Sequence, residues 1–186
     1  TFFDIKVAKE GDMHPTTGSV YQMLRTCEVG NIFPLGTKFS KAFNYKYTDG
    51  AGKQQLVHMA SYGIGTSRTM GVIVEKFHDA GGICWPKQIA PFHIHLLDLT
   101  KAQDATAAEL SDFLEKKGFE VLLDDRTASP GEKLKDADLI GIPVRLVVSE
   151  KTRGAIEWKL RTEKETKLLT KSALVKALAS YYAELP

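Results

Sequence analysis

The segment FHIHLLDL, residues 92–99, has the length and the apolar content of a buried β-strand. A helical pattern follows it as far as Gly118, and two more short apolar runs occupy residues 119–123 and 144–149. Strands that alternate with helices predict a sheet with helices on its faces. Residues 155–161 then alternate apolar and charged side chains, as a strand with one buried face does.

The predicted helices of this region have recognisable ends. Thr100 is a candidate N-cap for the first of them. The sequence Ser-Pro-Gly-Glu at residues 129–132 combines a capping serine, a proline in the first turn and a glutamate three residues after the cap. A short strand over residues 166–169 and an amphipathic helix over residues 171–185 complete an α/β domain with a mixed sheet of about five strands.

The first third of the chain predicts a different kind of sheet. Residues 1–27 are polar and rich in turn-forming residues, which indicates an irregular connector. Residues 28–62 carry short apolar runs separated by glycines, which predicts antiparallel strands, including one over residues 39–47. The pair Asp49-Gly50 lies between two such runs and is typical of a hairpin turn.

A glycine turn, GIGTSR at residues 63–68, stands between the last of these runs and a helical pattern. Glycines let a ligand approach the backbone, and a helix N-terminus attracts anions. Arg68 lies about 140° around the helix from the apolar stripe of Ile73, so it is expected to point away from the core and to be able to meet a phosphate. We expect the helix to end at Gly81 and Gly82. Taken alone, the motif is more often a tight turn followed by a surface arginine.

Three other features have an ordinary structural interpretation beside a functional one. His93 and His95 are expected to share a face of their strand, more often as a sheet pair than as metal ligands. Ser61 has no evident histidine and aspartate partners, so a serine nucleophile is not predicted. The sequence Asp-Asp-Arg at residues 124–126 ends a strand, where it either pairs with itself or faces a ligand at the edge of the sheet.

The composition is that of an ordinary globular chain, with 186 residues, 43% of them hydrophobic and 26% charged, and a net charge of +2. Cys27 and Cys84 are far apart, so neither a disulfide framework nor a four-thiolate zinc site is expected. No apolar run approaches the ~20 residues of a membrane span, and the first residues lack a signal-peptide pattern, so we expect a cytoplasmic protein. Residues 151–176 are rich in lysine and arginine, as in a nucleic-acid contact or a solvated charged face.

Several blocks of the sequence, taken together, resemble bacterial-type prolyl-tRNA synthetases, and they occur in the order of that class II family. EVGNIFPLGTKFS at residues 28–40 resembles the segment that follows the family's inserted editing domain. HMASYGIGTSR at residues 58–68 resembles motif 3 of class II synthetases in its prolyl form. The remaining blocks resemble the junction and the anticodon-binding domain: WPKQIAP at 85–91, LLDDR at 122–126, SPGEK at 129–133 and DADLIGIP at 136–143.

The resemblance implies four segments. Residues 1–27 would be the exit of the insertion or editing region, and residues 28–85 the C-terminal part of the class II catalytic domain with its antiparallel sheet. Residues 86–91 would be a linker, and residues 92–186 the anticodon-binding domain.

The resemblance also implies an aminoacyl-tRNA ligase, which activates proline with ATP to prolyl-adenylate and then transfers the prolyl group to tRNA(Pro). Arg68 corresponds to the motif 3 arginine that meets the γ-phosphate of ATP, with Gly63 and Gly65 beside the nucleotide. Mg²⁺ is expected with the ATP, and no zinc or other metal site is expected. The family further implies a homodimer and no membrane partner.

The proline pocket and the anticodon site follow from the same resemblance. Gly30, Asn31 and Ser61 correspond to positions around the proline, although many members have histidine in place of Asn31 and cysteine in place of Ser61. Both replacements keep a small polar group. For the anticodon, the corresponding positions are Arg126, Lys133 and Asp138, which would meet splayed bases.

The 186 residues do not contain the first two class II motifs or the body of the editing domain. We therefore expect the chain by itself to be unable to make prolyl-adenylate, because motif 2 supplies an arginine for the α-phosphate. Two alternatives stay open: a tRNA-binding module without catalysis, and a synthetase paralogue that lost aminoacylation. Threonyl, glycyl and histidyl relatives share the anticodon fold, but residues 30–33 and 136–143 favour the prolyl family.

Overall fold

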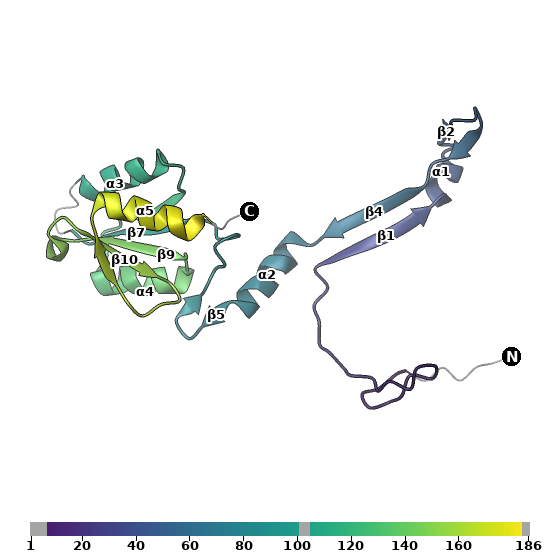
Figure 1. Ribbon diagram of the computed structural model, residues 1–186, viewed down its shortest axis with the longest axis horizontal. Coiled ribbons are helices and arrows are strands. Elements are labelled where there is room, and N and C mark those ends of the chain that lie inside the picture. Colours follow the sequence, from purple (N-terminus) through teal and green to yellow (C-terminus); the bar gives the residue numbers. More distant parts are fainter. Residues whose placement is uncertain (1–6, 101–104, 184–186) are drawn as a thin grey trace. The chain divides into compact units, whose positions relative to one another are not determined.

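The computed structural model describes residues 7–100 and 105–183, and the chain divides into two compact units, residues 1–69 and residues 70–186 (Figure 1). The second unit contains a five-stranded sheet with the strand order β11-β10-β9-β7-β8. The sheet is mixed, because β7 runs parallel to β8 and β9, whereas β10 runs antiparallel to β9 and β11. The predicted α/β fold with a mixed five-stranded sheet is confirmed. Its strands are β7 (Ile94–Asp98), β8 (Val121–Asp124), β9 (Val144–Val148), β10 (Ile156–Leu160) and β11 (Lys167–Leu169).

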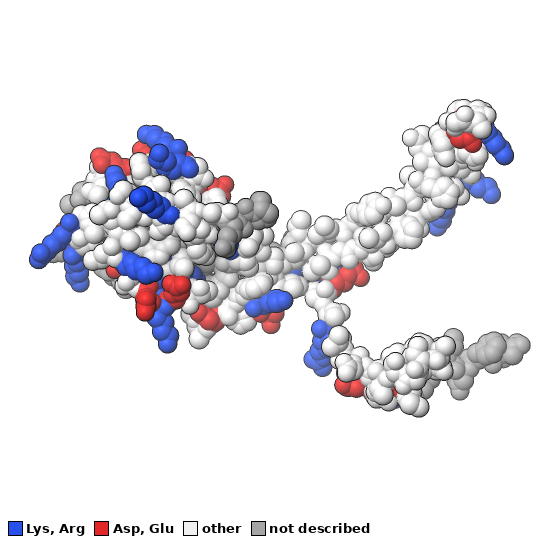
Figure 2. Space-filling view, in the orientation of Figure 1, with Lys and Arg blue, Asp and Glu red and all other residues white. Residues whose placement is uncertain are grey.

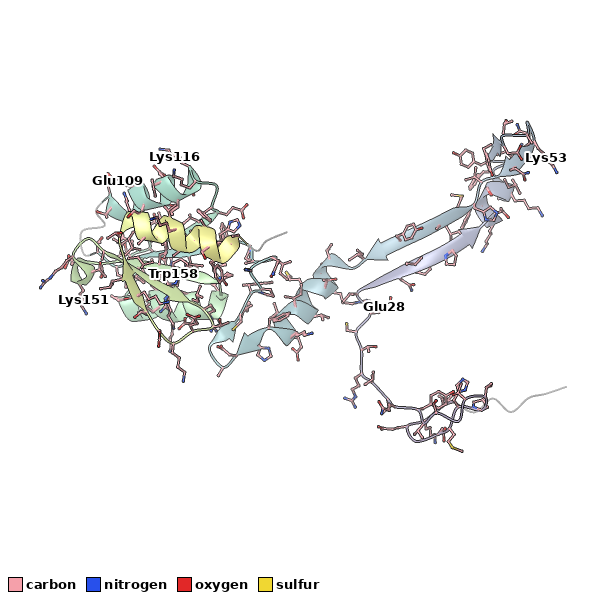
Figure 3. All side chains as sticks on the ribbon, viewed as in Figure 1. Glu28, Lys53, Glu109, Lys116, Lys151 and Trp158 are labelled. Atoms are coloured by element: carbon pink, nitrogen blue, oxygen red, sulfur yellow. The ribbon has the colours of Figure 1, made fainter. Side chains whose placement is uncertain are left out.

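Helices cover both faces of this sheet (Figure 1). On one face, α3 (Thr106–Glu115) and α5 (Lys171–Tyr182) bury leucines against the alternating apolar residues of the strands. Trp158 lies in this layer, and its ring meets Tyr181 of α5 edge to face (Figure 3). On the other face, α4 (Pro130–Ile140) packs through Ala137 on Leu97 and Val147. The two layers arise because successive strand residues point to opposite faces.

The ends of the helices match the predicted caps in one case and not in another. Ser129 caps α4 by accepting a hydrogen bond from the Glu132 amide (3.3 Å), and Gly141 ends it with a left-handed backbone. The prediction that Thr100 caps α3 is wrong, because α3 begins at Thr106 and its N-cap is Ala105. The Thr100 hydroxyl donates instead to Asp98 Oδ1 at 2.7 Å.

A small hairpin follows α2 (Thr66–Lys76), formed by β5 (His78–Asp79) and β6 (Gly82–Ile83). The predicted end of α2 at Gly81 and Gly82 is therefore wrong, because α2 ends at Lys76, Gly81 lies in the turn of the hairpin and Gly82 begins β6. The Asp79 carboxylate accepts both glycine amides and a two-pronged contact from Arg161 (2.6 and 2.8 Å). Gly82 has φ +140°, and a Cβ there would overlap the backbone of Leu139. The hairpin thus packs against the end of α4.

The first unit consists of paired strands and two short helical segments. Strands β1 (Gly30–Gly36) and β4 (Met59–Ile64) form one antiparallel ribbon, and β2 (Lys46–Thr48) and β3 (Gln54–Leu56) form another. The hairpin turn predicted at Asp49 is confirmed, because the Asp49 carboxylate accepts the amides of Ala51 and Lys53. The prediction of a strand over residues 39–47 is wrong for its first part, which forms the helix α1 (Lys38–Ala42). Phe39 of this helix and Phe43, its C-cap residue, are four residues apart, which is a helical spacing.

Most side chains of the first unit are exposed to solvent in this chain. Among its described residues, Ser40 alone is classed as buried, and Ile32, Tyr62 and Ile64 of the ribbon are more than 60% exposed. The ribbon surface carries almost no charge (Figure 2). An isolated two-stranded ribbon is only marginally stable in water. The second unit, in contrast, has a continuous buried core on the α3 and α5 side of its sheet.

We therefore expect the two units to differ in stability. Backbone amides of β7, β9 and β10 should exchange with deuterium at rates set by global unfolding, whereas those of β1 and β4 should exchange much faster, because little apolar burial opposes local opening. Hydrogen exchange followed by mass spectrometry on the 186-residue chain measures both. Equal protection in the two sets of strands would contradict this account.

Candidate nucleotide and nucleic-acid sites

The β1–β4 ribbon brings together some of the residues predicted for the proline pocket. Asn31 is opposite Gly63 and Phe33 is opposite Ser61 in the antiparallel register. Because directly opposed residues share a face, the side chains of Asn31 and Ser61 lie on the same face as Gly63. Gly30 belongs to the other face, opposite Ile64.

Glycine is required at position 30 by the closeness of the two strands. A Cβ on Gly30 would lie 2.9 Å from the carbonyl oxygen of Gly63, closer than real side chains come to backbone. A Cβ on Gly63, in contrast, would meet open space. Gly30 is therefore required for the two strands to pair closely. On the other face, which carries Asn31 and Ser61 and is called the polar face below, Gly63 has no side chain to block access to the backbone.

The glycine turn and Arg68 lie at the end of this ribbon. The amide of Gly65 donates to the carbonyl of Val29 (2.9 Å), and Arg68 Nη1 donates to the carbonyl of Glu28 (3.0 Å). Both bonds tie the start of α2 to the chain that enters β1. Arg68 is exposed, as predicted, and the acceptor that the structure gives its guanidinium is a backbone carbonyl. An arginine held in this way keeps its full charge available for an anion.

The C-terminal edge of β8 carries the Asp-Asp-Arg sequence. Arg126 forms a two-pronged contact with Asp124 (2.8 and 2.9 Å) and a third bond with Asp136 of α4 (2.7 Å). Asp124 is 4% exposed, and the hydrogen bonds from Arg126 hold its pKa below the usual range. Arg126 itself is 53% exposed. The cluster is thus paired within itself and still presents a guanidinium plane to solvent.

Lys133 lies beneath this edge. Its side chain is 3% exposed, and its ammonium donates to the carbonyls of Asp98 (2.7 Å) and Asp124 (3.1 Å), which are the last residues of β7 and β8. The same nitrogen lies 3.9 Å from Asp124 Oδ1. This lysine therefore supports the edge from inside, and the structure does not place it on the surface with Arg126.

Asp138 forms a separate group. It is 41% exposed, its carboxylate accepts from Arg145 Nη1 (2.9 Å), and its carbonyl accepts from Arg161 Nε (2.9 Å). Arg126 and Asp138 are therefore both accessible, but they belong to different hydrogen-bonded groups on α4 and its neighbours. Their contact with anticodon bases stays a prediction.

A cavity of about 210 Å³ opens between α4 and the edge of the sheet. Its lining includes Arg126, Asp136, Ile140 and His95. From the sequence, His95 is expected to form a sheet pair with His93, and no ligand-binding role is assigned to it; its side chain is 2% exposed. Burial lowers the pKa of its imidazole to about 4. The signal in the sequence was a histidine inside an otherwise apolar strand.

The expected shared face of His93 and His95 is wrong. His95 lies on the face of β7 that α4 covers, whereas the His93 ring meets Tyr182 of α5 edge to face (centroids 5.0 Å apart). The reason is that β7 begins only at Ile94, so the alternation of a strand does not extend to His93. Within residues 7–100 and 105–183, no group of three or more His, Cys, Asp or Glu side chains is placed to hold a metal ion.

A larger cavity, about 490 Å³, lies at the C-terminal ends of β7 and β9 on the α3 and α5 side. Its polar lining consists of Thr100, Thr106, Ser149, Glu150, Thr152, Arg153 and Lys171. It is separate from the cavity beside Arg126, since the two have no lining residue in common. In the part of the chain that the structure describes, no helix is both long and apolar enough to span a membrane.

Two family models match the chain, one in each half. The model of the tRNA synthetase class II core domain (G, H, P, S and T) matches residues 8–77, and the model of the anticodon binding domain matches residues 88–181. The chain belongs to the anticodon-binding-domain family and carries part of a class II synthetase core in front of that domain.

Within this class, the homologues of the chain are proline–tRNA ligases. The ligase of Kosmotoga olearia is 49% identical over 168 residues, which are 88% of this chain and 29% of the relative. The ligase of Shouchella clausii is 42% identical over 185 residues (97% and 33%), and that of Bacillus cereus strain G9842 is 39% identical over 188 residues (99% and 32%). The chain spans about a third of the length of these relatives. The resemblance to prolyl-tRNA synthetases is confirmed.

The buried imidazole of His95 predicts how stability changes with pH. His95 takes up a proton near pH 6.5 in the unfolded chain and only near pH 4 in the folded chain. The free energy of unfolding should therefore fall as the pH drops through this window, by up to about 3 kcal/mol. Urea unfolding at pH 7.0, 5.5 and 4.0 measures the change. The variant His95→Gln should lose much less over the same range.

The Asp124 carboxylate, which lines the same cavity, loses its contribution below this window, and the other carboxylates are common to both proteins, so the comparison with His95→Gln isolates the imidazole. Asp124 has a lowered pKa, so its contribution is lost as the pH falls below about 3.8, under the window of His95. An identical loss of stability in the wild type and in His95→Gln between pH 6.5 and 4 would show that His95 is not the group responsible.

Proposed function

We propose that the chain is part of a proline–tRNA ligase, in which its first unit contributes to amino-acid activation and its second unit binds the anticodon loop of tRNA(Pro). The homology to proline–tRNA ligases along both units is the observation that carries the proposal. The exposed Arg126 at the C-terminal edge of β8 supports the second half of it. We propose the segment 86–91, which lies within the second compact unit, as the linker between the catalytic and the anticodon-binding domains of the ligase. We propose the cytoplasm, where tRNA is charged, as the location.

The proposed reaction has two steps. The carboxylate of proline attacks the α-phosphorus of ATP, which forms prolyl-adenylate and releases pyrophosphate. A hydroxyl of the terminal ribose of the tRNA then attacks the prolyl carbonyl, which forms the ester and releases AMP. Both steps depend mainly on positioning and on neutralising negative charge. Class II synthetases use ATP together with Mg²⁺, and we treat the magnesium complex of ATP as the substrate.

Arg68 is the residue of this chain that we assign to the nucleotide. Its guanidinium lies beside the glycine turn at the start of α2, where backbone amides and the helix dipole also favour an anion. The γ-phosphate of ATP is the proposed partner, with Gly63 and Gly65 allowing close approach. Since Arg68 at present donates to the Glu28 carbonyl, binding of ATP would exchange that acceptor for a phosphate oxygen.

The proline pocket is proposed to use the polar face of the ribbon. Asn31 and Ser61 share that face, and Gly63 leaves space between their strands because it has no side chain. Gly30 serves the pocket indirectly, by letting the two strands approach each other. A homodimer is proposed for the whole ligase, and no zinc is assigned a role.

The second unit is proposed to bind RNA by itself, because it contains its own core. We expect an RNA hairpin with the sequence of a tRNA(Pro) anticodon arm to bind the 186-residue chain more tightly than a hairpin with a scrambled loop. Arg126→Ala and Arg126→Lys should both weaken this binding about tenfold, since each removes the planar fork that a base edge or a base plane recognises. Fluorescence anisotropy measures the dissociation constants.

Lys116→Ala is the matched control for this experiment. Lys116 is an exposed cation just after α3, on the opposite side of the sheet from α4 (Figure 3), so its loss should change binding by less than about twofold. Circular dichroism establishes that each variant is folded. Equal affinities of the chain for both hairpins would remove the basis for the proposed anticodon role.

For the activation step, the whole ligase that contains this chain is the proper subject. There, Arg68→Ala should lower the rate of proline-dependent exchange of pyrophosphate into ATP by about a hundredfold or more, the size expected for one lost charge-stabilising group. Arg25→Ala removes an exposed arginine outside the glycine turn and should leave the rate nearly unchanged.

The 186-residue chain alone should give no exchange, because its sequence does not contain the class II motif 2. Exchange by this chain at the rate of the whole ligase would refute that expectation. A whole ligase whose exchange rate does not respond to Arg68→Ala would refute the assignment of Arg68 to the nucleotide.

A further inference from the structure

The cavity between α4 and the sheet is lined by a buried histidine, His95, whose surroundings are unusual. Leu122, His95 and Arg145 form a row across β8, β7 and β9, because they are register partners on one face of the sheet. His95 is 2% exposed, and its Nδ1 has no hydrogen-bond partner among the described residues. Arg145 Nε, the neighbouring polar atom in this row, is buried and lacks a partner in the same part of the chain. Buried polar atoms are nearly always hydrogen-bonded, and of these two residues His95 lines the cavity, so its unpaired imidazole indicates a place for a polar ligand.

The charges around the cavity balance one another. Arg126 is paired with Asp124 and Asp136, and Lys133 lies 3.9 Å from Asp124. Arg145 is paired in the same way with Asp138. The three cations of this region therefore stand beside three carboxylates, those of Asp124, Asp136 and Asp138. His95 itself is neutral at pH 7, since burial lowers its pKa to about 4. A phosphate would find no excess of positive charge here, whereas a neutral group with hydrogen-bonding atoms would suit the site.

The size and the walls of the cavity restrict the ligand further. At about 210 Å³ it is smaller than the ~300–1,000 Å³ pockets that hold drug-sized molecules, so it fits one ring system. Leu122, Leu123 and Ile140 give it apolar walls, and the half-exposed guanidinium of Arg126 stands at its rim. Apolar walls with a few fixed polar groups are the usual environment of a planar, uncharged ring.

We propose that this cavity receives one unpaired nucleobase of the anticodon loop and that His95 reads the edge of that base by a hydrogen bond. The inference rests on the proposed anticodon role of the second unit and adds to it a specific pocket and a specificity-determining residue. A neutral imidazole offers one donor and one acceptor, so it distinguishes bases whose edges differ at one position. The Arg126 plane would cover the base at the rim, as guanidinium planes do in single-stranded RNA.

The test uses the 186-residue chain and a set of anticodon-arm hairpins in which each loop base is replaced in turn. The wild type should discriminate against replacement at one loop position by about fivefold to tenfold, the size of one neutral hydrogen bond. His95→Leu has a similar volume and no hydrogen-bonding atom, so its discrimination at that position should fall to within about twofold. His95→Gln keeps a donor and an acceptor and should retain part of the discrimination. At the other loop positions, a changed base should alter the affinity of the His95 variants by the same factor as it alters the affinity of the wild type.

The outcomes separate this inference from the proposed function. If the wild type binds no hairpin, the proposed anticodon role itself fails. If the wild type binds the anticodon hairpin specifically and His95→Leu keeps the same discrimination at every loop position, the pocket assignment is overturned while the anticodon role stands.

A second measurement covers the case in which His95→Leu does not fold. Long-range proton–nitrogen NMR spectra of the wild type report the ring nitrogens of His95 directly. The anticodon hairpin should shift these signals, and a hairpin without a base at the discriminated position should not. Ring signals that stay in place when the anticodon hairpin saturates the protein would overturn the proposal.

Discussion

One buried ammonium organises the surface on which the proposed tRNA recognition depends. Lys133 is removed from solvent and compensated by two backbone carbonyls, at the ends of β7 and β8, together with the nearby carboxylate of Asp124. A buried charge without such partners would be very costly, so α4 and the two strand ends have to keep their positions. Asp124 in turn holds Arg126, whose outer side faces solvent. The orientation of an exposed arginine is thereby fixed in large part by the buried carboxylate of Asp124, together with the partly exposed carboxylate of Asp136. Arg126 follows β8 on a loop, and a guanidinium held by such ion pairs loses less freedom on binding than one without partners.

The two units differ in what stabilises them, and the functions proposed for them are consistent with this difference. The second unit has apolar layers on both faces of a five-stranded sheet, so polar groups at its edge stand on a rigid base. In the first unit, the residues assigned to ATP and proline stand on a two-stranded ribbon with exposed apolar side chains. The ribbon is held by backbone pairing, by the close approach at Gly30 and by the bond from Arg68 to Glu28. Activation of an amino acid needs more precise placement than such a ribbon provides alone, so the catalytic role belongs to the whole ligase.

Much of the second unit followed from periodicity, because buried strands and capped helices leave clear signals. Ser129 with Pro130 gave the start of α4 correctly, and the alternation in β10 gave its buried face. The errors arose where tertiary contacts decide. Nothing local distinguishes a helix end at Gly81 from a hairpin turn, because the hairpin depends on Arg161, 80 residues further on. Lys133 had the residue type and the place of an RNA contact, yet its burial is decided by carbonyls from two strands. The cavity next to His95 is likewise formed by segments far apart in the sequence, so only the folded structure presents it.

The central claim is that RNA binds along β8 and α4, and backbone NMR tests it most directly. Amide signals of the isotopically labelled chain would be followed while the tRNA(Pro) anticodon hairpin is added. The account predicts that the largest shifts fall within residues 121–140, around Arg126 and the cavity beside it. Shifts concentrated instead at residues 148–156 and 171, which line the larger cavity on the opposite side of the sheet, would contradict it.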